Sequence, residues 1–187
     1  MRLAIGGTMA TFHGRFARQS FADDRVVMAM RRLLSKSGID PEKTPPASET
    51  LAQRILDGEE FPRRSEPDDL AGLLMLKTLV PWSVTASSRV RQPLRFRLGR
   101  AGETLRSGED VRPVLGWPVL EDAEQIVASP LMESHLEHAG EADEILLACY
   151  QPAEMADVVA AKVHLARFVV MTWAFRFLEE KTVVAGR

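Results

Sequence analysis

The chain has 187 residues, of which 45% are hydrophobic and 27% are charged, proportions typical of a globular protein with a single domain. Its formal net charge of -2 excludes a polycation, so a nucleic acid would have to contact a local basic patch. The single cysteine, Cys149, cannot form a disulfide within the chain, and the N-terminus has no sustained apolar stretch. We therefore expect a cytoplasmic protein without a signal peptide.

The N-terminal lead-in segment, residues 1–24, has the least regular pattern. Met1–Ile5 is typical of a short strand and Gly6–Gly7 of a turn, and no clear period follows. Asp24 is a favoured N-cap residue for a helix that runs to about Ser37 and ends at Gly38. Its apolar stripe consists of Val27, Met30, Leu33 and Leu34. Its solvent-exposed face consists of Arg31, Arg32 and Lys36.

A proline-rich turn precedes a second predicted helix. Prolines fix φ and disfavour the helical conformation in the residues before them, so residues 40–47 should be extended. Ser48 is the predicted N-cap of the helix, and Glu49 places a negative charge in its first turn. Gly58 is the expected stop. The prolines of this turn are Pro41, Pro45 and Pro46.

A third helix should begin at Asp68 or Asp69 and end before Pro81. The Phe61–Pro62 turn in front of it leaves Arg63 and Arg64 beside these two aspartates. Apolar residues cover most of the circumference of this helix, which is typical of a helix packed on more than one side. We therefore expect the central core helix here. The apolar residues are Leu70, Leu73, Leu74, Met75, Leu76, Leu79 and Val80.

Residues 90–98 alternate between apolar and arginine side chains, which predicts a strand with one basic face. The whole chain has 19 arginines and 5 lysines, and the planar guanidinium suits bidentate phosphate contacts. Two interpretations stay open. The arginines either form a solvated face paired with the acidic residues that come later, or they bind phosphates. They are Arg89, Arg91, Arg95 and Arg97.

Short strands are expected further along, followed by a long helix from Pro152 to about Glu180. The helix contains an apolar run of ten residues, Phe168–Phe177, whereas a membrane span needs ~20. This run therefore predicts a core helix or a partner surface, such as a contact between copies in a homo-oligomer, and no membrane association. The expected strands are Val111–Leu115, Pro118–Leu120, Ile126–Ala128 and Ile145–Tyr150.

The sequence contains no glycine-rich phosphate loop, no nucleophile elbow and no paired-cysteine zinc motif. His135 and His138 stand beside Glu133 and Glu137 in an acidic loop, where surface histidines are much commoner than a metal pair. Cys149 alternates with apolar neighbours, which indicates a structural thiol rather than a nucleophile. We expect no metal and no cofactor, and no residue pattern identifies a catalytic group.

A series of turn and helix-start residues gives a more specific signal. It consists of Gly38, Asp40, Pro41, Pro46, Ser48, Glu49, Leu51, Arg54, Gly58, Pro62, Arg63, Asp69 and Leu70. This series resembles the B3/B4 domain of the phenylalanyl-tRNA synthetase β subunit, in its free-standing form. Residues 101–105, 118–123 and 145–148 resemble later strands of the same domain. The resemblance covers roughly residues 25–151.

The resemblance implies an α+β fold: a single B3/B4-like domain over residues 1–187, layered, with a mixed β-sheet flanked by helices and residues 152–187 as closing helix and tail. It also implies binding of tRNA or an aminoacylated small ligand. In the family this domain hydrolyses tyrosine wrongly attached to the phenylalanine tRNA, as a second sieve, without a metal or a covalent nucleophile. The chain would be a trans-editing deacylase or an RNA-binding module, not a complete synthetase, because the resemblance extends to no aminoacylation core.

The resemblance also implies site residues. The substrate-binding candidates are Ser48, Glu49, Arg63, Arg64, Asp69 and Glu103, and the RNA-binding candidates are Arg89, Arg91, Arg95 and Arg97.

The chain departs from the family at several expected pocket positions. Gly72 and Met75 stand where the family has polar residues, and an expected acid near Ala86 is missing. Residues 129–135 replace a segment rich in tryptophan and arginine. These departures favour a changed ligand or a lost activity. The alternative function is therefore a small-molecule-binding or partner-binding protein on the same scaffold.

Overall fold

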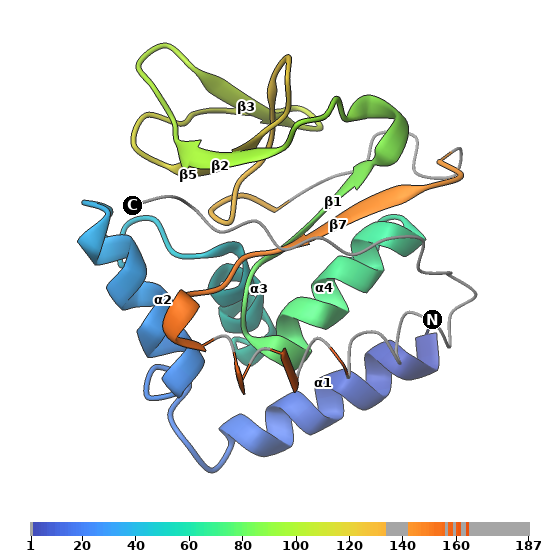
Figure 1. Cartoon of the computed structure of the whole chain (residues 1–187). Coiled ribbons are helices and arrows are strands. Elements are labelled where there is room, and N and C mark those ends of the chain that lie inside the picture. Colours follow the sequence, from blue (N-terminus) through green and yellow to red (C-terminus); the bar gives the residue numbers. More distant parts are fainter. Residues whose placement is uncertain (1, 134–141, 156, 159, 162–163, 165–187) are drawn as a thin grey trace.

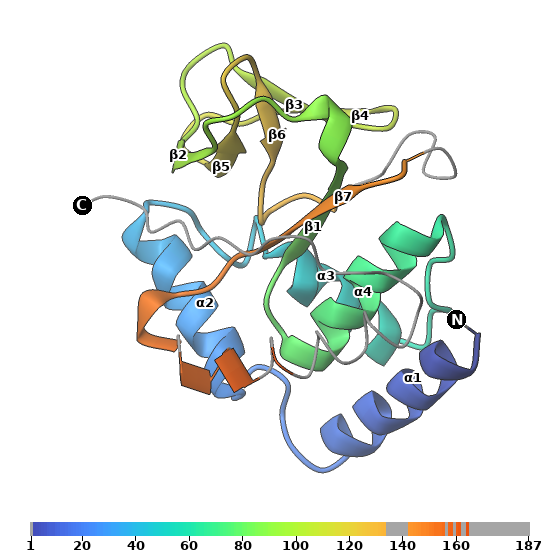
Figure 2. The same ribbon diagram turned by 45° about the vertical axis from the view of Figure 1, so that its right-hand side comes forward.

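The computed structural model describes all residues except 1, 134–141, 156, 159, 162–163 and 165–187. Four helices gather at one end of the molecule and small sheets at the other, with a two-stranded ribbon between them (Figures 1 and 2). We call residues 2–78, which contain the four helices, the helical region and residues 95–128, which contain five strands, the β region. A run of helices followed by a run of strands makes the fold α+β.

Helix α1 (Arg2–Phe16) corrects the expected strand and turn at the N-terminus. Ile5, Thr8 and Phe12 are buried at helical spacing. One of these three residues is polar and glycines follow Ile5, so the sequence shows no clear apolar helix face here. Burial in the core that α4 dominates therefore decides the conformation of this segment.

Helix α2 (Arg25–Lys36) confirms the prediction for its ends. The Asp24 carboxylate accepts a hydrogen bond from the Val26 N–H at 2.9 Å, and Ser37 is the C-cap. Gly38 follows with φ +80°, a conformation that glycine adopts without strain. One expected core position is wrong, because Leu33 is 40% exposed.

Helices α3 (Ala47–Leu56) and α4 (Glu66–Thr78) both begin earlier than expected. Pro46, not Ser48, occupies the N-cap position of α3, and Gly58 follows the C-cap with φ +91°. The hydroxyl of Ser65 caps α4 by accepting from the Asp68 N–H at 3.2 Å. The predicted role of α4 is confirmed, because nearly all of its apolar side chains are buried.

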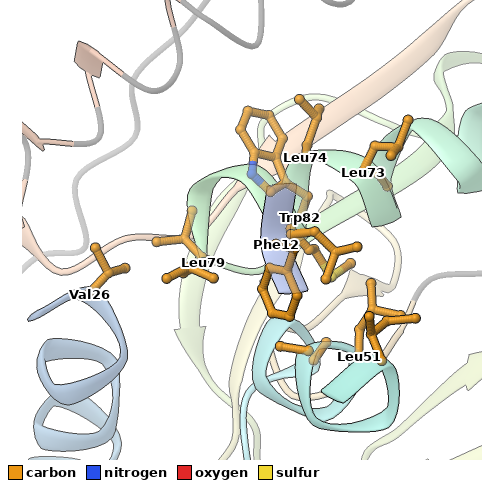
Figure 3. Close-up of a cluster of buried hydrophobic side chains, with 14 of the residues drawn as sticks. Phe12, Val26, Leu51, Leu73, Leu74, Leu79 and Trp82 are labelled. Carbon is orange, nitrogen blue, oxygen red and sulfur yellow. The ribbon is translucent and has the colours of Figure 1, made fainter. Parts of the chain in front are cut away.

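The main core forms around α4 and β1 (Trp82–Ala86). Phe12 from α1, Leu51 from α3 and Trp82 from β1 converge on Leu73 and Leu74 (Figure 3). Burying one such side chain contributes about 1.5–3 kcal/mol. The indole N–H of Trp82 donates to the Thr78 hydroxyl at 3.0 Å, so the polar edge of the ring is satisfied inside the core.

The strands form three small antiparallel sheets, which replace the single mixed sheet that we expected. Within the described residues the one parallel link is an isolated bridge between Gly99 and Leu115. The pairs are β1 with β7 (Ile145–Cys149), β2 (Arg95–Leu98) with β5 (Pro118–Glu121), β5 with β6 (Ile126–Ala128), and β3 (Thr104–Ser107) with β4 (Asp110–Pro113). The four later strands were predicted to within one or two residues, whereas β1 was missed.

Strand β5 is buried on both faces. Val119 packs in one cluster with Leu105 and Val114, and Leu120 packs in another with Ala128 and Tyr150. Successive side chains of a strand point to opposite faces, so β5 separates two small cores.

The arginine-rich strand is shorter than predicted. Arg89 ends the 3₁₀ turn η1 (Ser87–Arg89), and Arg91 precedes strand β2, so neither belongs to it. The alternation holds for Arg95 and Arg97, which are paired with Glu121 and Val119 on one face of the sheet.

The 3₁₀ turn η3 (Ala153–Met155) follows β7, and the described residues 157, 158, 160, 161 and 164 beyond it are helical. The expected long helix lies mostly outside the described residues, and its apolar run lies wholly outside them. Most of the acidic loop, residues 134–141 with both of its histidines, also lies outside them. Of the helices that are described, none has the length and apolar character to cross a bilayer.

Candidate functional site

Ser48 is a buried scaffold residue. Its hydroxyl donates to the Leu79 carbonyl at 3.2 Å. Leu79 is the left-handed C-cap residue that ends α4, with φ +63°. Ser48 therefore fastens the start of α3 to the end of α4, which is a scaffold role.

Glu49 is also committed to the scaffold. Its carboxylate accepts from the Arg31 Nε at 3.0 and 3.1 Å and pairs with another nitrogen of the same guanidinium. Arg31 also contacts Glu42 at 2.9 Å. The hydrogen bond to Glu49 raises the pKa of Arg31, and burial opposes this effect. The pair joins α2 to α3, and Arg31 is half-buried rather than solvent-exposed as expected.

Asp69 organises the turn in front of α4, as the sequence indicated. It accepts from the Arg63 Nε at 2.6 Å and from the Arg64 backbone N–H at 3.0 Å. Asp69 is 2% exposed, whereas the Arg63 side chain is 45% exposed. One edge of the Arg63 guanidinium is therefore bound, and part of the side chain stays accessible to a ligand.

Arg64 forms an ion pair with Glu133, a residue that the sequence analysis considered only as part of a metal site. Its guanidinium lies 3.1 Å from Oε2 of Glu133, and Arg54 lies 3.8 Å from Oε1 of the same carboxylate. The buried Oε1 atom has no hydrogen-bond partner among the described residues. Because these residues are distant in sequence, no local pattern could have indicated the cluster.

A small hollow of about 20 Å³ lies beside the Arg64–Glu133 pair. A space of this size holds about one water molecule and no amino-acid side chain. The ring of Phe61 reaches within 2.8 Å of the position that a Cβ at Gly72 would occupy. Phe61 therefore packs where polar pocket residues were expected, and Gly72 and Met75 line the wall of what remains.

Glu103 lies in the β region, away from the other substrate-binding candidates. It accepts two hydrogen bonds from Arg97, each 2.8 Å, and one from the Arg100 backbone N–H at 2.6 Å. The bonds from Arg97 are the main reason that the pKa of Glu103 falls to about 2. Glu121 binds the same guanidinium at 2.5 Å, and these bonds raise the pKa of Arg97.

The four arginines therefore do not form one equivalent stripe. Arg97 is held between two carboxylates, and the Arg91 side chain lies 4.0 Å from Glu124. Arg95 is exposed, and within the described residues its side chain has no hydrogen bond or ion pair. Residues 82–133 contain seven arginines and seven acidic residues, so the available positive charge is local.

Asp122 is a structural residue that the sequence analysis missed. Its buried carboxylate accepts from the backbone N–H groups of Arg91, Glu124 and Gln125 at 2.7–2.8 Å. Burial opposes ionisation, but these three bonds outweigh it and lower the pKa of Asp122. An aspartate followed by a short polar turn is a signal that could have indicated this role.

The described part of the chain contains no group of three or more metal-ligating side chains. Burial raises the pKa of the Cys149 thiol to about 12, so the thiolate form that reacts as a nucleophile is disfavoured. Among the site candidates from the sequence, Arg63 and Arg95 offer accessible guanidinium groups for an anion.

No family model and no curated protein matches the sequence.

Proposed function

We propose that this chain is a B3/B4-like domain that binds tRNA, or the aminoacylated end of an RNA, through arginines of the β region and of the turn before α4. The proposal rests on the resemblance over residues 25–151 together with the accessible guanidinium groups. Arginine forks suit phosphate oxygens, and a chain with net charge -2 needs such local contacts.

The observation that supports the proposal most is the contrast between Arg95 and Arg97. Both stand on one face of β2, but Arg97 is 17% exposed and bound by Glu103 and Glu121, whereas Arg95 is exposed and unpaired within the described residues. An arginine without a carboxylate partner binds a phosphate without first losing an ion pair. Arg95 is therefore the proposed RNA contact, and Arg97 is its structural support.

Hydrolysis of a mischarged ester is the less favoured form of this proposal. The hollow beside Arg64 and Glu133 has about 20 Å³, which is too small for a tyrosyl group. Ser48 and Glu49 are held by scaffold contacts. We therefore propose binding without the editing reaction of the family.

The direct test is RNA binding as a function of salt concentration. Arg95→Gln should weaken binding of the phenylalanine tRNA and reduce the slope of log K against log salt by about 0.7–0.9, the value for one lost phosphate contact. Arg18→Gln, another exposed arginine, is the control and should leave affinity unchanged. Equal affinity of wild type and Arg95→Gln, or no salt-dependent binding at all, would remove the proposal.

A second assay separates binding from editing. The pure protein is incubated with phenylalanine tRNA that carries tyrosine. The rate of deacylation is compared with the rate of spontaneous hydrolysis in buffer alone. We expect the background rate. Faster hydrolysis would restore the editing interpretation and require the hollow beside Arg64 to open.

A further inference from the structure

A groove beside α2 lies away from all the predicted site residues. It has a volume of about 400 Å³, within the range of small-molecule sites, and runs between α2 and the turn η3. In Figures 1 and 2 the orange turn that follows β7 lies against α2. The described residues that line the groove are Arg25, Met28, Arg32, Glu154 and Met155.

One wall of the groove is a single face of α2. Arg25, Met28 and Arg32 follow one another at intervals of three and four residues, so their side chains lie on the same side of the helix. Met28 is 40% exposed, so its side chain gives this wall an apolar contact surface. The opposite wall contributes Met155, which is 5% exposed and belongs to the main core. The groove therefore combines a fixed apolar wall with guanidinium groups.

The charge of the groove favours an anion. Arg32 pairs with Glu154 at 3.3 Å, and both side chains are largely exposed, so this pair is weak. Arg25 has no ion pair or hydrogen bond of its side chain in the described part of the chain. The neighbouring Asp24 carboxylate is already engaged by Arg15 and by the Val26 N–H. Two arginines thus line the groove with one carboxylate, and no carboxylate among the described residues pairs with Arg25.

We infer that this groove binds a small organic anion in which one phosphate or carboxylate group is attached to an apolar or aromatic group. The anionic group would contact Arg25 and Arg32, and the apolar group would lie between Met28 and Met155. Inorganic phosphate fits only half of this description, because it has no apolar group to contact Met28 and Met155. The inference does not rest on RNA binding, since none of these residues belongs to the proposed RNA surface.

The test uses phenyl phosphate as the probe, with phenylacetate as the carboxylate counterpart and inorganic phosphate and phenol as partial probes. Binding is followed by calorimetry and by the NMR signals of isotope-labelled methionine methyl groups. We expect saturable binding of phenyl phosphate or phenylacetate that shifts the signals of Met28 and Met155 and leaves that of Met75, in the helical core, unchanged. The preferred probe identifies the anionic group.

Variants connect the binding to the groove. Arg25→Gln should weaken binding about five-fold or more through loss of a charge-assisted hydrogen bond, and Met28→Gln should weaken it through loss of the apolar wall. Arg18→Gln is the control and should bind like wild type. Thermal unfolding identifies variants that bind weakly because they are misfolded.

Four results would overturn the inference: no saturable binding at millimolar probe, unchanged Met28 and Met155 signals, equal affinity for inorganic phosphate and phenyl phosphate, or equal affinity of Arg25→Gln and Arg18→Gln. RNA affinity should be the same for Arg25→Gln and wild type. A loss of RNA affinity would assign the groove to the RNA surface instead, whereas failure of RNA binding in the wild type would leave the small-ligand result intact.

Discussion

The helical region and the β region bury their side chains in different ways. The helical region has one continuous core that draws on all four helices and β1, whereas the β region has two small clusters on opposite faces of β5. The large core also draws polar residues inward, including Ser48, Glu49 and Asp69. The small clusters leave most arginines at the surface. Ser48, Glu49 and Asp69 in the helical region are therefore scaffold residues, whereas Arg95 in the β region stays accessible.

The largest expected difference between the regions concerns the cores. Leu74 in α4 is fully buried in the large core, and Leu74→Ala should cost up to about 5 kcal/mol of the free energy of unfolding. Leu120→Ala should cost about 2 kcal/mol, because the small cluster around Leu120 collapses more easily into the space. Urea denaturation measures both. Equal losses of unfolding free energy would contradict the proposed difference between the large core and the small clusters. A separate unfolding transition for Leu120→Ala alone would also contradict it.

The second largest expected difference is in the free energy of unfolding that is lost when an ion pair is broken in each region. Glu49→Gln removes one partner of the pair that joins α2 to α3 and should cost about 3 kcal/mol, the lower end for a buried pair, because Arg31 is 28% exposed. Arg112→Gln in the β region breaks the exposed contact with Asp110 and should cost less than about 1 kcal/mol. The same denaturation experiment compares the two. A larger loss for Arg112→Gln would mean that the β region depends on its surface charges.

Replacing a glycine by alanine should change the stability in opposite directions in the two regions. A Cβ on Gly99 would lie 2.1 Å from the Val114 carbonyl oxygen, so Gly99→Ala should destabilise the β region by about 2 kcal/mol. A Cβ on Gly14 in α1 would meet nothing within 4 Å, so Gly14→Ala should stabilise by about 0.5–1 kcal/mol. Melting temperatures show the direction. A stabilised Gly99→Ala would contradict the close backbone approach.

The smallest expected effect is a dependence on pH in the β region. The pKa of Glu103 lies at about 2 in the folded chain, below its ordinary 4.5, because the folded state favours the ionised form. Its contribution to stability is present above about pH 4.5 and is lost as the pH falls toward 2. Glu103→Gln should therefore lower the melting temperature near neutral pH and match wild type at low pH.

Glu109→Gln, an exposed glutamate of the turn between β3 and β4, is the control and should follow wild type at every pH. If Glu103→Gln and wild type lose stability in parallel between about pH 5 and pH 2, the bonds from Arg97 to Glu103 do not stabilise the β region.

Local features of the fold were predictable because local residues cause them. Asp24 caps α2, Gly58 ends α3, and Asp69 meets the arginines of the turn before it, all over a few residues of sequence. The apolar circumference of α4 likewise marked it as the core helix. The strands after Gly108 followed from short apolar segments between turns.

Contacts between distant segments were not predictable in the same way. Arg31 meets Glu49 across 18 positions, and Glu133 meets Arg54 and Arg64 across many more. The helix α1 depends on burial in the core around α4. The groove between α2 and η3 exists because the end of the described chain returns to the second helix.

The sequence by itself determined approximately where the helices from α2 to α4 lie, how α2 is capped and which helix is central, because capping and hydrophobic periodicity act within a few residues. Only the tertiary structure decided which charged side chains are bound to one another and which stay accessible. Arg95 and Arg97 look alike in the sequence, and they differ because the fold brings Glu103 and Glu121 to one of them. An ion pair depends on positions in space, which the order of residues does not reveal.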